Sequence, residues 1–170
     1  MIDDLLIQAK KELSQLEINR KEIYSRNFLE SVLNPLQLQY SRENTIIINK
    51  PLPDVLLDID PEKMEQAINN LLENAVKYSA KESTIEVEAG TTEEVFKLYI
   101  SDNGYGIPEE EIPYIFDRFY RGRISETQNI EGSGLGLWSC KQIIEAHQGS
   151  ITVDSREGGG TNFSIILPLN

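Results

Sequence analysis

The stretch Asp102-Asn103-Gly104-Tyr105-Gly106 joins an apolar, β-branched run at residues 95–101 to a long segment that contains many glycines. The run predicts a buried strand, so Asp102 stands at a strand end, where a lone carboxylate is costly to bury without a donor. Glycines at 104 and 106 allow positive φ and remove two Cβ atoms, which lets a flat ring lie close to the backbone. The stretch therefore predicts the floor of a binding site. Taken alone it also fits an ordinary turn, since Asp, Asn and Gly favour turns.

The composition is that of one globular domain. The 170 residues are 39% apolar and 26% charged, which is ordinary for a single core. The formal charge of -12 argues against a nucleic-acid surface, because phosphate backbones need clustered Lys and Arg. The single cysteine, Cys140, excludes an internal disulfide, and no apolar run approaches the roughly 20 residues that cross a bilayer. We therefore expect a cytoplasmic segment without membrane contact, which could belong to a longer soluble or membrane-anchored protein.

The first half of the chain predicts helices and short strands in alternation. Residues 1–16 have the apolar spacing of an amphipathic helix, which either docks on its own domain or ends a bundled segment. Ser25 is expected to cap the second helix and Pro35 to bend it. Asp60 and Pro61 are expected to begin a third helix. The remaining expectations are a strand at 17–24, the second helix reaching about residue 42, and strands at 45–49 and 55–59.

The helix after Asp60 has two different faces. One face is apolar and suits the core, whereas Asn70, Asn74, Lys77 and Tyr78 recur at i, i+4, i+7 and i+8. Asparagine is a mediocre helix former, so two asparagines one turn apart need a reason other than propensity. Their amide oxygens could both point into a site.

The second half predicts a sheet interrupted by a long loop. Strands are expected at 84–89 and 95–101, as a hairpin, and at 151–154 and 162–167, with residues 158–161 as a turn. A helix is expected at 135–147. Residues 105–134 show little regular pattern beyond a short helical piece near 109–120, and about 30 such residues are typical of a lid or of disorder. The order predicts a mixed α/β sandwich after a helical preface.

Gly132, Gly134 and Gly136 lie at the start of the helix at 135–147. Their backbone N–H groups could face an anion at the positive end of the helix dipole, but the glycine pattern alone is weak evidence, since a glycine-rich helix entry also fits a tight turn. The glycine spacing fails the dinucleotide fingerprint, and no Walker A loop or H-R-D catalytic loop is present. The common nucleotide motifs are therefore excluded.

Five motifs occur in one order along the chain. They are Asn70-Leu71-Leu72-Glu73-Asn74-Ala75-Val76-Lys77-Tyr78, Asp102-Asn103-Gly104-Tyr105-Gly106, Phe116-Asp117-Arg118-Phe119-Tyr120-Arg121, Gly132-Ser133-Gly134-Leu135-Gly136-Leu137 and Gly158-Gly159-Gly160-Thr161. In this order they resemble the N, G1, F, G2 and G3 boxes of the catalytic, ATP-binding domain of sensor histidine kinases. The resemblance implies an α+β two-layer sandwich of the Bergerat type, a mixed sheet with helices on one face and a long ATP lid. It covers residues 17–170, and residues 1–16 resemble the end of the family's dimerisation helix.

The resemblance also implies roles for individual residues. Asp102 would accept a hydrogen bond from the adenine amino group, Asn74 would be the protein ligand of Mg²⁺, and Lys77 would contact the phosphates. Tyr78 would flank the nucleotide. The other nucleotide-binding positions implied are Gly104, Gly106, Ile107, Gly132, Ser133, Gly134, Leu135, Gly136, Leu137 and Thr161.

The catalytic positions implied by the resemblance are Asn70, Asn74, Lys77, Arg121 and, less directly, Arg118. The two arginines would stabilise charge on the transferred γ-phosphoryl group. Gyrase-type and chaperone relatives have a glutamate at the place of Asn70, which orients the attacking water; Asn cannot accept a proton there, so poor hydrolysis is implied. Phe116 and Phe119 are interpreted as lid packing, and Glu73 as a solvated side chain.

The phosphoryl acceptor of the family is a histidine on the dimerisation helix. The only histidine of this chain is His147, in a place that the family uses structurally. We therefore expect a histidine kinase domain that binds ATP and Mg²⁺ and donates the γ-phosphoryl group to a dimerisation and histidine-phosphotransfer domain, with a response regulator as the further partner. The alternatives are an interaction module that binds nucleotide without phosphotransfer, or an anti-sigma serine kinase, which would be expected to keep the glutamate.

Overall fold

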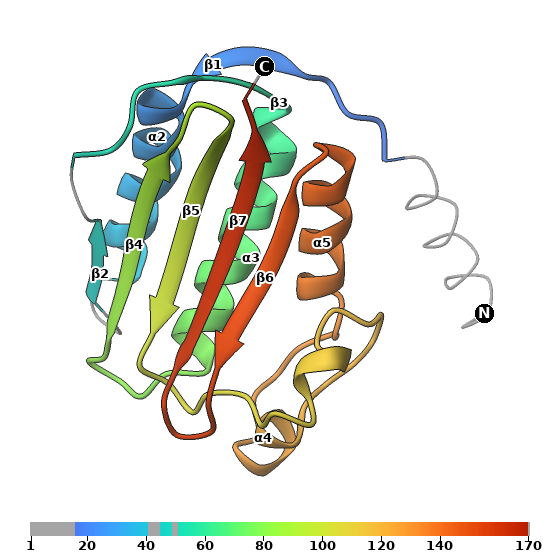
Figure 1. The fold of residues 1–170 in the computed structure, drawn as a ribbon. Coiled ribbons are helices and arrows are strands. Elements are labelled where there is room, and N and C mark those ends of the chain that lie inside the picture. Colours follow the sequence, from blue (N-terminus) through green and yellow to red (C-terminus); the bar gives the residue numbers. More distant parts are fainter. Residues whose placement is uncertain (1–15, 41–44, 49–50, 170) are drawn as a thin grey trace.

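The computed structural model describes residues 16–40, 45–48 and 51–169 (Figure 1). A long sheet stands in front of three helices, and an irregular segment lies below the sheet. The elements are β1 (Lys21–Tyr24), α2 (Ser25–Tyr40), β2 (Thr45–Ile48), β3 (Leu56–Ile59), α3 (Pro61–Lys77), β4 (Thr84–Thr91), β5 (Val95–Asp102), η1 (Ile112–Tyr114), α4 (Arg123–Thr127), α5 (Gly136–Ala146), β6 (Ser150–Ser155) and β7 (Thr161–Pro168).

The main sheet has five strands in the order β2-β4-β5-β7-β6. Strands β2 and β4 are parallel, and the other neighbours are antiparallel, so the predicted mixed sheet is confirmed. Strand β5 is central, and its alternate residues are buried because they face the helices. Its last residue, Asp102, pairs with Ile85 on one side and Thr161 on the other. The predicted hairpin of 84–89 and 95–101 is confirmed and extends slightly at both ends.

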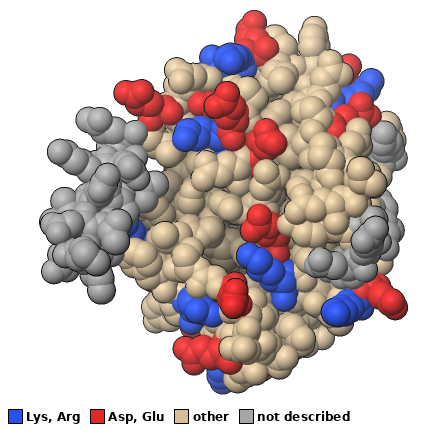
Figure 2. All heavy atoms as spheres, turned by 180° about the vertical axis from the view of Figure 1, so that it is seen from behind, with Lys and Arg blue, Asp and Glu red and all other residues tan. Residues whose placement is uncertain are grey.

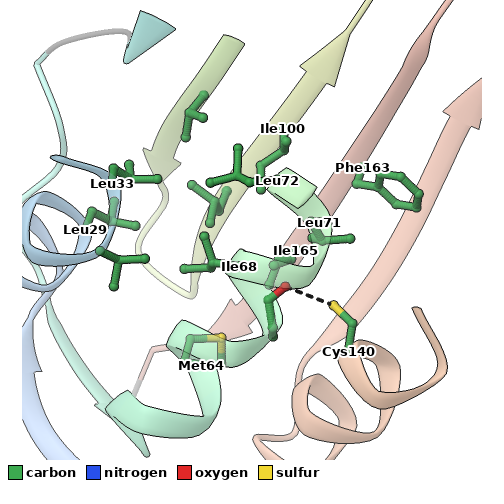
Figure 3. Packing of buried hydrophobic residues seen from close by; sticks show 14 of the residues in the cluster. Leu29, Leu33, Met64, Ile68, Leu71, Leu72, Ile100, Cys140, Phe163 and Ile165 are labelled. Carbon is green, nitrogen blue, oxygen red and sulfur yellow. Dashed lines mark hydrogen bonds between the residues drawn. The ribbon is translucent and has the colours of Figure 1, made fainter. Parts of the chain in front are cut away.

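The core lies between the sheet and the helices, which cover one face only (Figure 1). Leu33 from α2, Ile68 and Leu72 from α3, and Ile100 and Ile165 from the sheet are all at most 1% exposed. Figure 3 shows these side chains gathered between the two layers. Alternating apolar residues in β5 and β7 and the apolar face of α3 meet here, which is why the fold is a two-layer α+β sandwich. Its helices and sheet fix the position of Asp102 relative to α3.

Helices α3 and α5 pack side by side against the sheet (Figure 3). The Cys140 thiol of α5 lies 3.7 Å from the carbonyl oxygen of Ala67 in α3, and both residues are fully buried. Small residues at this contact allow the two helix backbones to approach closely. As a result, the start of α5 lies against the middle of α3.

Several N-terminal predictions change in detail. Ser25 is the first residue of α2 and not a cap before it; its hydroxyl donates to Pro53 O at 2.7 Å and accepts from Val55 N at 3.0 Å. Strand β1 has only 4 residues, and it pairs with β3 in a separate two-stranded sheet. Pro35 lies inside α2, as predicted. The predicted helix at 1–16 falls almost wholly outside the described residues, as does the expected end of α2 near 42, so the boundary at residue 17 stays a prediction.

The segment between β5 and α5 is mostly irregular, as predicted. The helical piece expected near 109–120 is only the three-residue turn η1, and the short helix α4 was not predicted. Among the described residues, no helix is long and apolar enough to span a membrane. On the helix-covered side of the molecule, acidic and basic side chains are interspersed and are not separated by sign (Figure 2).

Candidate functional site

A cavity of about 240 Å³ opens between α3, the end of β5, the irregular segment and the start of α5. Most of the residues predicted for the site line it, although they come from five separate parts of the chain. They are Asn70, Asn74, Lys77, Tyr78, Asp102, Gly106, Ile107, Arg121, Gly132, Ser133, Gly134, Gly136, Leu137 and Thr161. The fold thus brings together residues that are up to 91 positions apart, since Asn70 and Thr161 both line the cavity.

Asp102 forms the buried end of the cavity. Its side chain is 8% exposed, and Oδ1 accepts a hydrogen bond from Gly104 N at 2.8 Å. Burial raises the pKa of Asp102 from 3.8 to about 6, and the N–H groups of Gly104 and Thr161 act in the opposite direction. A carboxylate that is held by a backbone donor and still costly to ionise is typical of a ligand-binding position.

The glycines near Asp102 serve backbone packing. A Cβ on Gly106, whose φ is +69°, would lie 1.8 Å from Arg156 O. A Cβ on Gly160, whose φ is +80°, would lie 2.0 Å from Asp102 O. The space that sequence reasoning reserved for a ligand ring is therefore filled by the chain itself. The two glycines hold the turn between β6 and β7 against the end of β5.

The opposite end of the cavity is built by α3 and the start of α5. The Asn70 side chain donates from Nδ2 to Gly136 O at 3.3 Å, which leaves its Oδ1 free to accept. Asn74 lines the cavity one turn further on, and its amide makes no hydrogen bond within the described residues. Lys77 lies at the rim and forms a half-exposed ion pair with Glu73 at 3.4 Å. Glu73 is exposed, as predicted, but it also lines the cavity.

The irregular segment closes the cavity from the outside. Arg121 donates from Nη2 to Ile130 O at 2.5 Å. Burial raises the pKa of the Tyr78 hydroxyl, and the nearby positive charge of Arg121 opposes that rise. Gly134, with φ at +71°, lies directly against the backbone of Phe119. These contacts place a guanidinium, a phenol and a glycine-rich turn around one opening.

Three predicted residues do not line the cavity. The Arg118 guanidinium lies 4.9 Å from the Phe119 ring centroid and 5.1 Å from that of Trp138, so it packs between lid and α5. Its Nε and Nη2 atoms are buried without a hydrogen bond among the described residues. Gly104 lines a separate hollow together with Ala80 and Gly158. Leu135 donates from its backbone N to Ser133 Oγ at 3.3 Å and does not line the cavity.

Sequence reasoning missed several lining residues. Most of them are apolar or small side chains of the lid, whose irregular backbone offers no periodicity to follow. Phe163 is different, because it belongs to the buried face of β7 and could have been placed by its alternation with Ile165. The missed residues are Ala75, Glu111, Ile115, Tyr120, Gly122, Ile124, Ser125, Glu131 and Phe163.

The chemistry of the cavity suits an adenine nucleotide and a hard cation. The Asp102 end combines one carboxylate with apolar walls, which a planar base with an exocyclic amino group would match. The α3 end offers amide oxygens from Asn70 and Asn74 and the N-terminus of α5, where backbone N–H groups attract anions. A Mg²⁺ ion usually takes few protein oxygens and completes its shell with phosphates and water, so a single amide ligand fits it.

The comparisons with known proteins agree with this description. The family described as "Histidine kinase-, DNA gyrase B-, and HSP90-like ATPase" matches residues 59–170. The sensor histidine kinase WalK of Bacillus subtilis (strain 168) is 32% identical over 170 residues, with 99% of this chain and 28% of the relative covered. The sensor protein kinase WalK of Staphylococcus aureus is 35% identical over 170 residues, with 99% of this chain and 41% of the relative covered.

Solved structures have the same fold. The mycobacterial sensor histidine kinase MprB superimposes with a TM-score of 0.72 at 26% identity, covering 88% of this chain and 97% of that one. The histidine kinase ThkA, in a complex with the response regulator protein TrrA, gives a TM-score of 0.76 at 21% identity, covering 99% of this chain and 48% of that one. At that identity the second likeness concerns the fold alone.

Fold, cavity and family match together define an ATP-binding domain of the Bergerat type. The chain belongs to the family of histidine kinase-, DNA gyrase B- and HSP90-like ATPases. The relatives named above are sensor histidine kinases, so the resemblance predicted from the five motifs is confirmed. The chain spans 28% and 41% of the length of the two curated relatives.

Proposed function

We propose that this chain is the ATP-binding, phosphoryl-donating domain of a sensor histidine kinase. The observation that carries the proposal is one cavity with a buried carboxylate at one end and an amide-lined helix and a glycine-rich helix start at the other. An adenine nucleotide would lie along it with the base at Asp102 and the phosphates near Asn74.

Asp102 selects the base. The N–H groups of Gly104 and Thr161 both act on the Asp102 carboxylate, with Gly104 N bonded to Oδ1. A carboxylate has further lone pairs, and we take Oδ2 as the atom that accepts from the adenine amino group. Guanine has a carbonyl at that place and would meet the carboxylate with a repelling lone pair. Thr161, Gly106 and Ile107 form the walls that exclude water around the hydrogen bond.

The phosphates would bind at the opposite end of the cavity, near α3 and the start of α5. Asn74 would hold Mg²⁺, which when bound neutralises charge on the triphosphate. Lys77 has a flexible stem and a weak, solvent-exposed pair with Glu73, so it can turn to the phosphates at little cost. The backbone N–H groups from Gly132 to Gly136 wrap the anion, and Arg121 reaches the terminal phosphoryl group once it leaves Ile130 O.

The residue at position 70 favours transfer over hydrolysis. Asn70 is committed to Gly136 O through its Nδ2 and has no basic group with which to activate a water molecule. The terminal phosphoryl group is therefore kept for a protein acceptor. We propose that this acceptor is a histidine of a dimerisation and histidine-phosphotransfer domain, and that a response regulator receives the group next. ThkA is a histidine kinase whose structure was solved with such a regulator.

Incubation of the chain with Mg·ATP labelled at the γ-phosphate tests the proposal. The chain alone should bind nucleotide without labelling itself. Acid-labile label should appear on a dimerisation domain that carries an acceptor histidine when that domain is added. The His147→Asn variant is the control for self-labelling, and α-labelled ATP is the control for tight binding. Stoichiometric label on His147 of the parent chain would contradict the proposal.

A further inference from the structure

His147 is the residue at the C-terminal end of α5, and it is 2% exposed. Both of its ring nitrogens are used. Nδ1 lies 2.7 Å from Ile143 O, one turn back along α5. Nε2 accepts a hydrogen bond from Asp60 N at 2.9 Å, across the boundary to another helix.

These partners determine the state of the ring. A carbonyl oxygen cannot donate, so Nδ1 carries the proton, and a backbone N–H cannot accept, so Nε2 is bare. His147 is therefore neutral, with its proton on Nδ1. Protonation of Nε2 would place two N–H groups face to face and break the bond to Asp60 N.

Asp60 is the N-cap of α3, so the bond from His147 joins two helices. The Asp60 carboxylate accepts from Lys63 N at 3.1 Å and begins the helix that carries Asn70 and Asn74. Helix α5 begins at Gly136, against which Asn70 is bonded. The antiparallel pair α3 and α5 is thus tied at the phosphate end by Asn70 and at the opposite end by His147.

The residues that precede β1 are tied into the same joint. Asn19 N donates to Asp60 Oδ2 at 2.8 Å, and Arg20 Nη2 donates to Ala146 O at 3.0 Å. The second bond supplies a cation to a carbonyl at the end of α5, where the helix dipole favours positive charge. The segment before the sheet therefore touches both helices of the nucleotide site at one place.

We propose that His147 is a positioning residue that, in its neutral Nδ1–H form, pins the start of α3 to the end of α5 and to Asn19 and Arg20. Only the consequence for nucleotide affinity rests on the proposed function. Loss of the pin lets α5 shift along α3, which moves Gly136 and the lid relative to Asn70 and Asn74. The joint opens when His147 takes up a proton.

The charges around the ring determine the pH range. Burial lowers the pKa of His147 below 6.5, and the Arg20 guanidinium beside it acts in the same direction. The bond to Ile143 O and the carboxylates of Asp60 and Asp58 oppose that fall. Because burial depresses the folded pKa of this base, the stability that the pin contributes is fully present above about pH 6.5 and is lost as the pH falls from there through the lower, folded pKa of His147.

The chain contains a single histidine, so in a sample without a histidine tag every imidazole signal belongs to His147. Long-range nitrogen–proton NMR of the parent chain should show the Nδ1–H tautomer at neutral pH and a titration midpoint below 6.5. An Nε2–H tautomer, or a midpoint at or above that value, would overturn the proposal. This measurement needs no variant to fold.

Two variants of similar size distinguish the hydrogen bond that His147 accepts from the space that its side chain fills. The amide oxygen of His147→Gln can take the place of Nε2 and accept from Asp60 N, whereas His147→Asn reaches only the place of Nδ1. We expect about tenfold faster hydrogen exchange at the Asp60 amide in the Asn variant than in the Gln variant, the effect of one lost buried hydrogen bond. Affinity for Mg·ATP at pH 7.5 should also be about tenfold weaker in the Asn variant.

The Gln variant should stay within about twofold of the parent in affinity at pH 7.5 and should lose only the part of the parent's pH dependence between pH 7.5 and 5.5 that comes from His147. Asp102 titrates equally in both, so the difference between parent and Gln variant at each pH isolates His147. Equal amide exchange in the two variants would overturn the pin. If the parent bound no nucleotide, the proposed function would fail while the tautomer and amide measurements still decided the role of His147.

Discussion

Replacing Asp102 with Asn should separate nucleotide recognition from folding, because the same carboxylate is costly to the fold and useful to the ligand. Its pKa rises from 3.8 to about 6, which corresponds to a cost on the order of 3 kcal/mol for the ionised form at neutral pH. The neutral amide avoids that cost. We therefore expect the Asp102→Asn variant to be at least as stable as the parent at pH 7.

Binding should change in the opposite direction. Gly104 N–H bonds one carboxylate oxygen at 2.8 Å, so the Asn oxygen will occupy that place and the Asn NH₂ group will face the base. A donor then meets the adenine amino donor. A charge-assisted hydrogen bond is worth roughly 1.5 to 3 kcal/mol, so affinity for ATP should fall about 10- to 150-fold.

Calorimetric titration with adenosine, ADP and ATP measures the loss, and thermal unfolding from pH 4 to 8 measures stability. Because the folded pKa is raised for an acid, the parent should lose stability as the pH rises from about 4 through about 6, and the variant should lack this slope. Asp154→Asn, an exposed site on β6, controls for the lost charge. Adenosine binding equal to that of the parent would show that Asp102 is only a turn residue.

Three further outcomes follow from the geometry. Asn74→Ala should weaken Mg-dependent binding of ATP more than binding of adenosine in calorimetry, because it faces the phosphates; equal losses would contradict that role. Hydrogen exchange at residues 125–131 should slow when Mg·ATP binds, since Arg121 and the lid N–H groups then gain partners; unchanged exchange would argue against a lid. Gly160→Ala should destabilise the fold by about 1 to 3 kcal/mol in urea titration, because its Cβ would meet Asp102 O. Gly90→Ala, with nothing within 4 Å, is the matched control and should cost less.

The fold could be predicted wherever side-chain periodicity reports burial. The apolar face of α3 and the alternation in β5 are visible in the sequence because each side chain there is either buried in the core or partly or fully exposed to solvent. Asp60 and Pro61 mark the start of α3 through local hydrogen bonding, which needs no knowledge of the fold. The assignment of β2 and β3 to different sheets could not be predicted, because strand pairing is set by contacts distant in sequence.

The site could be predicted where a motif determines both the residue type and the backbone conformation at a position. The glycines near Asp102 show where prediction from the sequence stops. They indicate a special backbone near Asp102, but the sequence does not reveal that they are needed for contact between chain segments and not for a ligand ring. Gly106 and Gly160 are required by contact between chain segments 50 or more residues apart, which composition cannot reveal. The packing of Arg118 on Trp138, 20 residues further along the chain, is likewise a contact that composition cannot reveal. The order of the five motifs along the sequence indicates the fold and the site, because it reflects many of these long-range contacts at once.

The central claim, that this cavity holds Mg·ATP with the base at Asp102 and the phosphates at Asn74, is tested most directly by a crystal structure. The chain would be crystallised with Mg²⁺ and an ATP analogue that cannot be hydrolysed. We predict the adenine amino group within hydrogen-bond distance of Asp102 Oδ2, the metal on Asn74 Oδ1, and Arg121 turned from Ile130 O to the γ-phosphate. A nucleotide bound elsewhere, or bound with its base at the Asn74 end, would contradict the account.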